Sequence, residues 1–282
     1  MKMSNLITRT ITGVFFVAAI ISSVVIDPYL FTLLFLVVII VGLLEFYKLV
    51  ETTGIKPQKW LGLLTGIILF LSISLHSLSD SWLWIEKVHD NLLLINLPFV
   101  FLIFIFELFR KKEHPFTNIA FSILGIVYFV LPLSLLPSFF KPGVLHWNSW
   151  HYDILLGYFI LVWLNDTMAY VSGTTFGVHK LFERISPKKT WEGSLGGAVV
   201  TLLGSWLLSL FLKDLNLMQW LVMACIVIVF GTLGDLAESQ FKRSLNCKDS
   251  GNIFPGHGGM LDRFDAVVGS APFVYIFIQL LS

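Results

Sequence analysis

Long apolar stretches alternate with short polar segments along almost the whole chain. Nine of these stretches approach the length of about 20 helical residues that crosses the hydrocarbon core of a membrane. All but one lack Asp, Glu, Lys and Arg, and the exception carries Asp166 near its middle. Because lipid offers no hydrogen bonds to an open backbone, the pattern predicts helices, and the fold class is an all-α integral membrane protein with a bundle of about nine transmembrane helices. The stretches are Thr10–Ile26, Pro28–Leu44, Trp60–Ser79, Asn91–Phe106, Pro115–Phe140, Ile154–Gly177, Gly193–Leu212, Leu215–Gly234 and Ala266–Leu281.

Basic residues lie on alternate sides of these stretches. Of the 19 Lys and Arg residues, only Lys87, Lys141 and Lys213 fall in the loops of the opposite side. This bias predicts a cytoplasmic N-terminus and a C-terminus on the far side. The first stretch follows Lys2 and Arg9 as in a signal peptide, but its flank fits the overall charge pattern, and we expect an uncleaved helix.

Composition agrees with a membrane protein, because only 13% of the 282 residues are charged, against about 25% in soluble domains. The two cysteines, Cys225 and Cys247, predict neither a disulfide nor a Cys-based metal site. Polar segments concentrate in the C-terminal half. We therefore divide the chain into N-terminal transmembrane helices, residues 1–153, and a catalytic C-terminal region, residues 154–282.

The first candidate motif surrounds Asp166 inside the sixth stretch. Asp166, Tyr170 and Gly173 share one helix face. A carboxylate inside a span costs about 2.5–3.5 kcal/mol on insertion scales, so it needs a partner, a cation or a water-filled cavity. The alternative to a functional role is a structural pair with Lys or Arg of a neighbouring loop.

The second motif is the basic pair Lys188 and Lys189, which precedes an expected helix with Thr190 as its N-cap. Lysines beside a helix N-terminus suit a polyphosphate, although the same pair also satisfies the positive-inside rule. Three glycines follow and permit close approach of a ligand or another helix: Gly193, Gly196 and Gly197.

The third motif, residues 235–265, combines acids, bases and glycines at the membrane edge. Asp262 and Asp265 are three residues apart, so both can face one cation, and Asp235 and Lys242 share a face if the preceding helix continues. Oxygen ligands with substrate phosphates suit Mg²⁺. His257 could orient phosphate or act as a base, or it could only hydrogen-bond backbone. The alternative for the whole segment is a charged hairpin with internal salt bridges.

Residues 239–265 resemble the signature of the phosphatidate cytidylyltransferase family, also called CDP-diacylglycerol synthases. That pattern is Ser-x-apolar-Lys-Arg, four free positions, Lys-Asp-x-small, an apolar residue, Pro-x-His-Gly-Gly and Asp-Arg-apolar-Asp, and every fixed position is met. The runs 165–170 and 186–193 are also similar to family stretches. The resemblance implies that CTP and phosphatidic acid give CDP-diacylglycerol and pyrophosphate, with a divalent cation and often as a dimer. The charge pattern puts all three motifs on the cytoplasmic side, so we expect an enzyme of the inner membrane whose site faces the cytoplasm, without nucleic acid as a partner.

The resemblance and the motifs together define the candidate site. The candidate metal ligands are Asp235, Asp262 and Asp265, for Mg²⁺ or Mn²⁺, with a second cation left open. The candidate phosphate-binding residues are Lys188, Lys189, Ser239, Lys242, Arg243, Lys248 and Arg263. The candidate catalytic residues are Asp166, Asp249, His257, Asp262 and Asp265.

Two other functions compete with this interpretation. The nearer one is another CTP-dependent membrane enzyme that shares parts of the acidic and lysine patterns. It is either a polyprenol or isoprenoid-alcohol kinase, which would transfer the γ-phosphate, or a cytidylyltransferase for archaeal ether lipids. A transporter would use Asp166 and Asp235 for ion coupling, but the inverted repeats it predicts are not found. Glu45 and Glu107, near cytoplasmic helix ends, are interpreted as structural, satisfied by exposure or by a nearby Lys or Arg.

Overall fold

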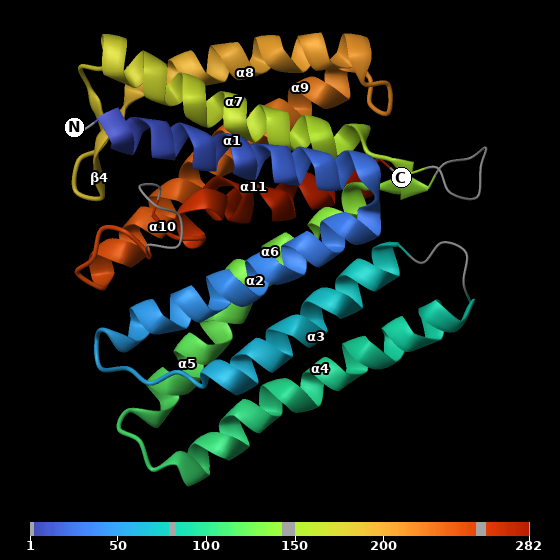
Figure 1. The fold of residues 1–282 in the computed structure, drawn as a ribbon, viewed down its shortest axis with the longest axis vertical. Helices are drawn as coiled ribbons and strands as arrows, with labels where there is room; N and C mark the ends of the chain where they lie inside the picture. The colour runs from blue at the N-terminus through green and yellow to red at the C-terminus, as the bar shows by residue number, and fades with distance from the viewer. Residues whose placement is uncertain (1–2, 79–82, 143–149, 252–257, 282) are drawn as a thin grey trace. The chain divides into compact units, whose positions relative to one another are not determined.

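The computed structural model describes residues 3–78, 83–142, 150–251 and 258–281, and helices dominate them (Figure 1). The chain forms two compact units, Met1–Ser138 with Leu245–Arg263 and Phe139–Ser244 with Phe264–Ser282. Helix α11 (Leu261–Gln279) begins in the first unit and ends in the second. The signature segment is therefore divided between the two units.

The first unit is built from the helices of the N-terminal apolar stretches, and α3 and α4 run side by side (Figure 1). Asp27 separates the first two helices, because its carboxylate accepts hydrogen bonds from the N–H groups of Tyr29 (2.7 Å) and Leu30 (3.2 Å) and caps the next helix. The helices are α1 (Met3–Ile26), α2 (Pro28–Glu51), α3 (Lys59–Ser77), α4 (Leu83–Arg110), α5 (Pro115–Gly125) and α6 (Leu131–Ser134), followed by a 3₁₀ turn (Leu136–Phe139).

The second unit contains the C-terminal helices and two short antiparallel strand pairs. The polar residues between the sixth and seventh apolar stretches form the hairpin β3–β4, which adds a small β element to the all-α prediction. Thr190 ends this hairpin and caps α8 by accepting a hydrogen bond from the Gly193 N–H (3.2 Å), as the sequence predicts. The elements are β1 (Lys141–Pro142), β2 (Trp150–His151), α7 (Asp153–Phe176), β3 (Lys180–Phe182), β4 (Ser186–Thr190), α8 (Trp191–Phe211), α9 (Leu217–Ile226) and α10 (Thr232–Ser244).

Glycines bring α7 and α8 together, and the two helices lie side by side in Figure 1. A side chain at Gly193 would meet the backbone of Ala169 and Gly173, and one at Gly196 would overlap Ser172. The sequence leaves open whether these glycines permit close approach of a ligand or of another helix, and in the structure they face a neighbouring helix. Small residues at such a contact are typical of helix pairs in membranes.

The helices have the length and surface of membrane spans. Each of the nine apolar stretches falls largely within a helical run, and large apolar side chains such as Phe101 (69% exposed) and Phe211 (77% exposed) point outward, where lipid can cover them. The membrane-protein class is thereby confirmed, whereas the number of nine spans and the orientation stay predictions. In the described residues, six runs are long and apolar enough to cross a membrane: Pro28–Glu51, Lys59–Ser77, Pro115–Phe139, Asp153–Phe176, Trp191–Phe211 and Leu217–Ser244.

Two of these runs contain a π-helical turn, at Ile126–Val130 and at Val227–Gly231. A π turn closes hydrogen bonds over one more residue than an α turn, and such turns are frequent at functional sites. The second π turn joins α9 to α10. It therefore directly precedes the helix that carries Asp235.

Candidate active site

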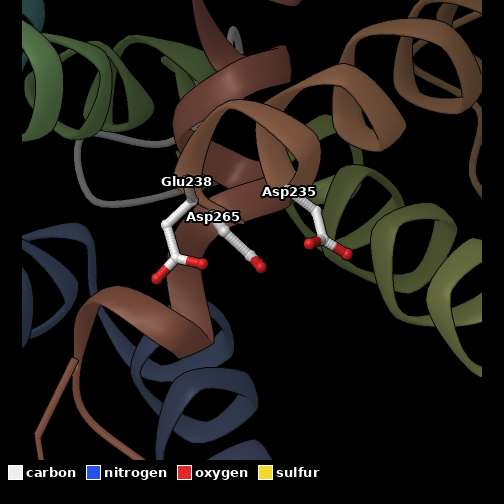
Figure 2. Close-up of side chains that lie close together, drawn as sticks. All are labelled: Asp235, Glu238 and Asp265. Atoms are coloured by element: carbon white, nitrogen blue, oxygen red, sulfur yellow. The ribbon is translucent and has the colours of Figure 1, made fainter. Parts of the chain in front are cut away.

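Three carboxylates from two helices converge in the second unit. Asp235 and Glu238 lie three residues apart on α10, so they project from one face, and Asp265 reaches them from α11 (Figure 2). One oxygen of each lies within 4.8 Å of one oxygen of each of the others. Glu238 is buried, and the other two residues are half-buried. Three ionised carboxylates at this separation repel one another, and a bound proton or nearby positive charge relieves that repulsion.

Two glycines explain why the carboxylates meet. Gly234 on α10 and Gly269 on α11 face each other, and a side chain at either would come within 2.7 Å of the other's Cα. The absence of both side chains lets the two helix backbones approach closely. Gly234 immediately precedes Asp235, and Asp265 lies one helical turn before Gly269. The close crossing therefore fixes the distance between the acids of the two helices.

Two lysines supply part of the compensating charge. Lys189 Nζ from β4 lies 2.6 Å from Asp235 Oδ2, and Lys242 Nζ lies 2.6 Å from Glu238 Oε2. The Ser239 hydroxyl also donates to Asp235 Oδ1 (3.3 Å). The charged-hairpin interpretation predicts salt bridges within residues 235–265, and the pair Lys242–Glu238 is one of this kind. The pair Lys189–Asp235, however, joins α10 to the β3–β4 hairpin, which lies outside that segment.

Asp166 adds a fourth acidic group near this cluster. It lies exposed on α7, and its negative charge acts on Asp265 together with the charges of Asp235 and Glu238. The neighbourhood of Asp166 thus includes the acidic cluster. This placement supports a cation near the single acid of the sixth apolar stretch.

The cluster fits a divalent cation of the hard, oxygen-binding type. Oxygens that share one Mg²⁺ at about 2.0–2.1 Å lie roughly 3–4 Å from one another, and the three carboxylates need only small rotations to reach that spacing from within 4.8 Å. All three residues of the cluster offer carboxylate oxygens, which favour Mg²⁺ or Mn²⁺ over zinc. Asp235, Glu238 and Asp265 could therefore hold such an ion.

Asp262 has different contacts from Asp265, although the two share the first turns of α11. Its Oδ2 atom accepts hydrogen bonds from the N–H groups of Gly259 (2.8 Å) and Ser250 (3.2 Å) and from the Ser250 hydroxyl (3.0 Å). All of these groups belong to the first unit. Asp265 therefore joins the carboxylate cluster, whereas Asp262 accepts hydrogen bonds from the segment before α11.

The remaining candidates lie at the surface of the described structure or outside it. His257 lies outside the described residues. The others are exposed in β4, in the last turn of α10, in the segment that follows it and in α11: Lys188, Arg243, Lys248, Asp249 and Arg263.

Sequence reasoning misses the contacts of two buried carboxylates, Glu238 in the acidic cluster and Glu45 beside the signature segment. Glu238 is three residues after Asp235 and four before Lys242, and that spacing is a usable signal for a shared helix face. Glu45 on α2 accepts hydrogen bonds from the signature segment, including the Met260 N–H (2.6 Å). The chain carries no spacing signal for that contact, since the partners are 215 residues apart.

Comparison with known proteins assigns the chain to a family. A model of the cytidylyltransferase family matches residues 7–281, which includes the helices of both units. The chain belongs to the cytidylyltransferase family. Members of this family are enzymes that use CTP, and the resemblance read from residues 239–265 is thereby confirmed.

Individual curated relatives are similar to this chain over most of its length. A phosphatidate cytidylyltransferase of Staphylococcus saprophyticus is 35% identical over 263 residues, covering 92% of this chain and 96% of the relative. Proteins of the same name from Staphylococcus haemolyticus and Staphylococcus epidermidis are 33% identical over 249 residues and 32% identical over 248 residues, and each alignment covers 90% of the relative. The similarity therefore extends over nearly the full length of these family members.

Proposed function

We propose that this chain transfers the cytidylyl group of CTP to phosphatidic acid and releases pyrophosphate. The family membership over residues 7–281 carries this conclusion, and the relatives named phosphatidate cytidylyltransferase support the lipid substrate. The acidic cluster with its lysines supports nucleotide phosphates as ligands. Helices with lipid-facing surfaces support a substrate that is itself a membrane lipid.

The reaction requires positioning and charge neutralisation rather than a protein nucleophile. An oxygen of the lipid phosphate attacks the α-phosphorus of CTP, the bond between that phosphorus and the bridging oxygen to the β-phosphorus breaks, and pyrophosphate leaves with the bonding electrons. The attacking oxygen is already ionised at neutral pH, so no strong general base is needed. Lys189 and Lys242, which pair with carboxylates in the structure, would turn toward phosphate oxygens when CTP binds.

A divalent cation, Mg²⁺ or Mn²⁺, is part of this proposal. Asp235, Glu238 and Asp265 would hold it, on the fit of their oxygens described above. When bound, the ion would neutralise charge on the entering and leaving oxygens. Asp262, which accepts backbone hydrogen bonds, would order the glycine-rich turn through which backbone N–H groups reach phosphate. Lys188, Arg243, Lys248 and Arg263 stay proposed phosphate-binding residues, and Asp166, Asp249 and His257 stay proposed site residues.

The proposal places the site on the cytoplasmic side of the inner membrane, where CTP is found. The distribution of basic residues supports nine spans with a cytoplasmic N-terminus and a far-side C-terminus, and residues 154–282 as the catalytic region. Assembly as a homodimer belongs to the same proposal. Accessibility tags at the two chain ends test the topology, and ends on the same side of the membrane would refute the odd number of spans.

Substrate labelling tests the reaction itself. The purified protein in detergent is incubated with phosphatidic acid, Mg²⁺ and CTP labelled at either the α- or the γ-phosphate. Label from the α position should enter lipid, and the γ label should leave as pyrophosphate. Asp265→Asn should abolish this transfer, whereas Glu113→Gln, at an exposed turn, should retain it. Transfer of the γ label to a lipid alcohol would identify a kinase instead.

A further inference from the structure

A buried carboxylate of the N-terminal half contacts the signature segment. Glu45, on α2, is 6% exposed. Its Oε2 atom accepts hydrogen bonds from the N–H groups of Met260 (2.6 Å) and Leu261 (3.1 Å), and its Oε1 atom accepts one from the Ser250 hydroxyl (3.2 Å). All four residues belong to the same compact unit. One side chain therefore joins both ends of the segment 250–261.

Two signature glycines make room for this carboxylate. A side chain at Gly251 or at Gly259 would overlap Glu45 Oε1, and at Gly259 it would also meet the Ser250 hydroxyl. The glycines of the signature are thus explained here by close packing around a charged group. A residue that only filled space in the core would not require two glycines and three directed hydrogen-bond donors around its carboxylate.

The carboxylate lies at the N-terminus of α11, where the helix dipole favours negative charge and where N–H groups lack partners within the helix. Leu261 is the first residue of α11, and the first turns of that helix carry Asp262 and Asp265. Glu45 thus fixes the start of the helix that presents two candidate site acids. Its position on α2 gives the N-terminal helices a direct structural link to the signature.

We propose that Glu45 is a positioning residue for cytidylyl transfer, which holds the turn before α11 in the geometry that the reaction requires. This inference rests on the proposed function. Its effect on turnover is indirect, through the Met260 and Leu261 backbone, so Glu45 is not itself assigned contact with substrate. Loss of groups that orient active-site residues typically costs about 10–100-fold in activity.

Glu107 provides a matched control for a purely structural role. It is 4% exposed on α4 and accepts hydrogen bonds from Gln58 (2.7 Å), Asn118 (2.8 Å) and Arg110 (2.7 Å). It therefore resembles Glu45 in burial and in its number of polar partners, and these three partners all lie outside the signature. Glu107→Gln and Glu45→Gln remove the same charge from the same unit with the same change in shape.

The experiment compares Glu45→Gln, Glu45→Ala and Glu107→Gln with the unsubstituted protein, each isolated as a monodisperse species in detergent. Steady-state turnover is measured with CTP and phosphatidic acid, and amide hydrogen exchange is followed in the peptide that covers Met260 and Leu261. We expect kcat to fall about 10–100-fold in Glu45→Ala and less in Glu45→Gln, which retains an acceptor oxygen. Exchange at the start of α11 should accelerate in the same order, and Glu107→Gln should change neither quantity.

The outcomes separate this inference from the proposed function. A parental kcat and parental exchange in Glu45→Ala would overturn the positioning role, as would equal losses of kcat in Glu45→Gln and Glu107→Gln. If the unsubstituted protein does not turn over CTP, the proposed function fails. The exchange measurement still shows in that case whether Glu45 orders the turn.

Discussion

The substitution Asp265→Asn tests the acidic cluster most directly, because it removes one charge and retains the shape of the side chain. One oxygen of Asp265 lies within 4.8 Å of oxygens of Asp235 and Glu238. Two unit charges at that distance repel by about 3.5 kcal/mol at an effective dielectric constant of about 20. Lys189 and Lys242 offset part of this repulsion, and solvent screens more of it. We therefore expect the neutral amide to stabilise the metal-free protein by about 1–2 kcal/mol.

Mg²⁺ should reverse this order. An ion present at 100 times its dissociation constant stabilises the protein that binds it by about 2.7 kcal/mol. The unsubstituted protein should gain this stability, and Asp265→Asn should gain little of it. The variant is thus expected to melt above the parent in EDTA and below it in Mg²⁺, with differences in Tm of about 2–4 °C for each kcal/mol.

The assay is thermal unfolding in detergent, with EDTA or with excess MgCl₂, on protein that elutes as one species. Glu113→Gln, which removes an exposed charge in the turn between α4 and α5, serves as the control and should respond to Mg²⁺ as the parent does. If Asp265→Asn melts below the parent in EDTA and gains as much stability from Mg²⁺, the cluster is not the cation site and the reasoning is refuted.

Three further predictions concern residues of the second compact unit. Lys189→Met should reduce kcat/KM for CTP by about 10–100-fold, because hydrogen bonds to charged groups contribute about 1.5–3 kcal/mol; unchanged kinetics would remove this lysine from the phosphate site. Gly269→Ala should push α11 away from Gly234 and abolish the Mg²⁺-induced rise in Tm, and a full response to Mg²⁺ would contradict the close-crossing explanation. Tyr158→Phe, which loses the hydrogen bond to the Ser270 hydroxyl (2.8 Å), should destabilise the protein by about 1 kcal/mol and preserve kcat in the folded fraction, as thermal unfolding and turnover can show.

The sequence predicts those features that depend on local or one-dimensional patterns. Apolar length predicts the helical stretches, because burial of the backbone in lipid leaves few other structures. The N-cap at Thr190 also follows from a local rule, and the structure confirms it. The sequence leaves open whether the helix continues from Asp235 to Lys242, and the structure shows that it does. The β3–β4 hairpin escapes prediction, because its short strands carry no apolar alternation.

The geometry of the site depends on contacts between distant segments, and these are not predictable from spacing. Spacing within one helix pairs Asp262 with Asp265, whereas the cluster joins Asp265 to α10 through the crossing at Gly234. The contact of Glu45 with Ser250 spans 205 residues. A single sequence contains no signal for such a contact, since it arises from how the helices pack.

The π-helical turn at Val227–Gly231 has a consequence for changes in chain length. Conversion of a π turn to a regular α turn removes one residue from the turn, so the π turn holds one extra residue while the flanking helical segments keep their relative orientation. A single-residue insertion between this turn and Asp235 has no such compensation, and it would rotate Asp235 and Glu238 by about 100° relative to the preceding segment, away from Asp265. Substitutions in this apolar turn should consequently be tolerated far better than insertions between it and the acids, which makes the turn a register element for the site.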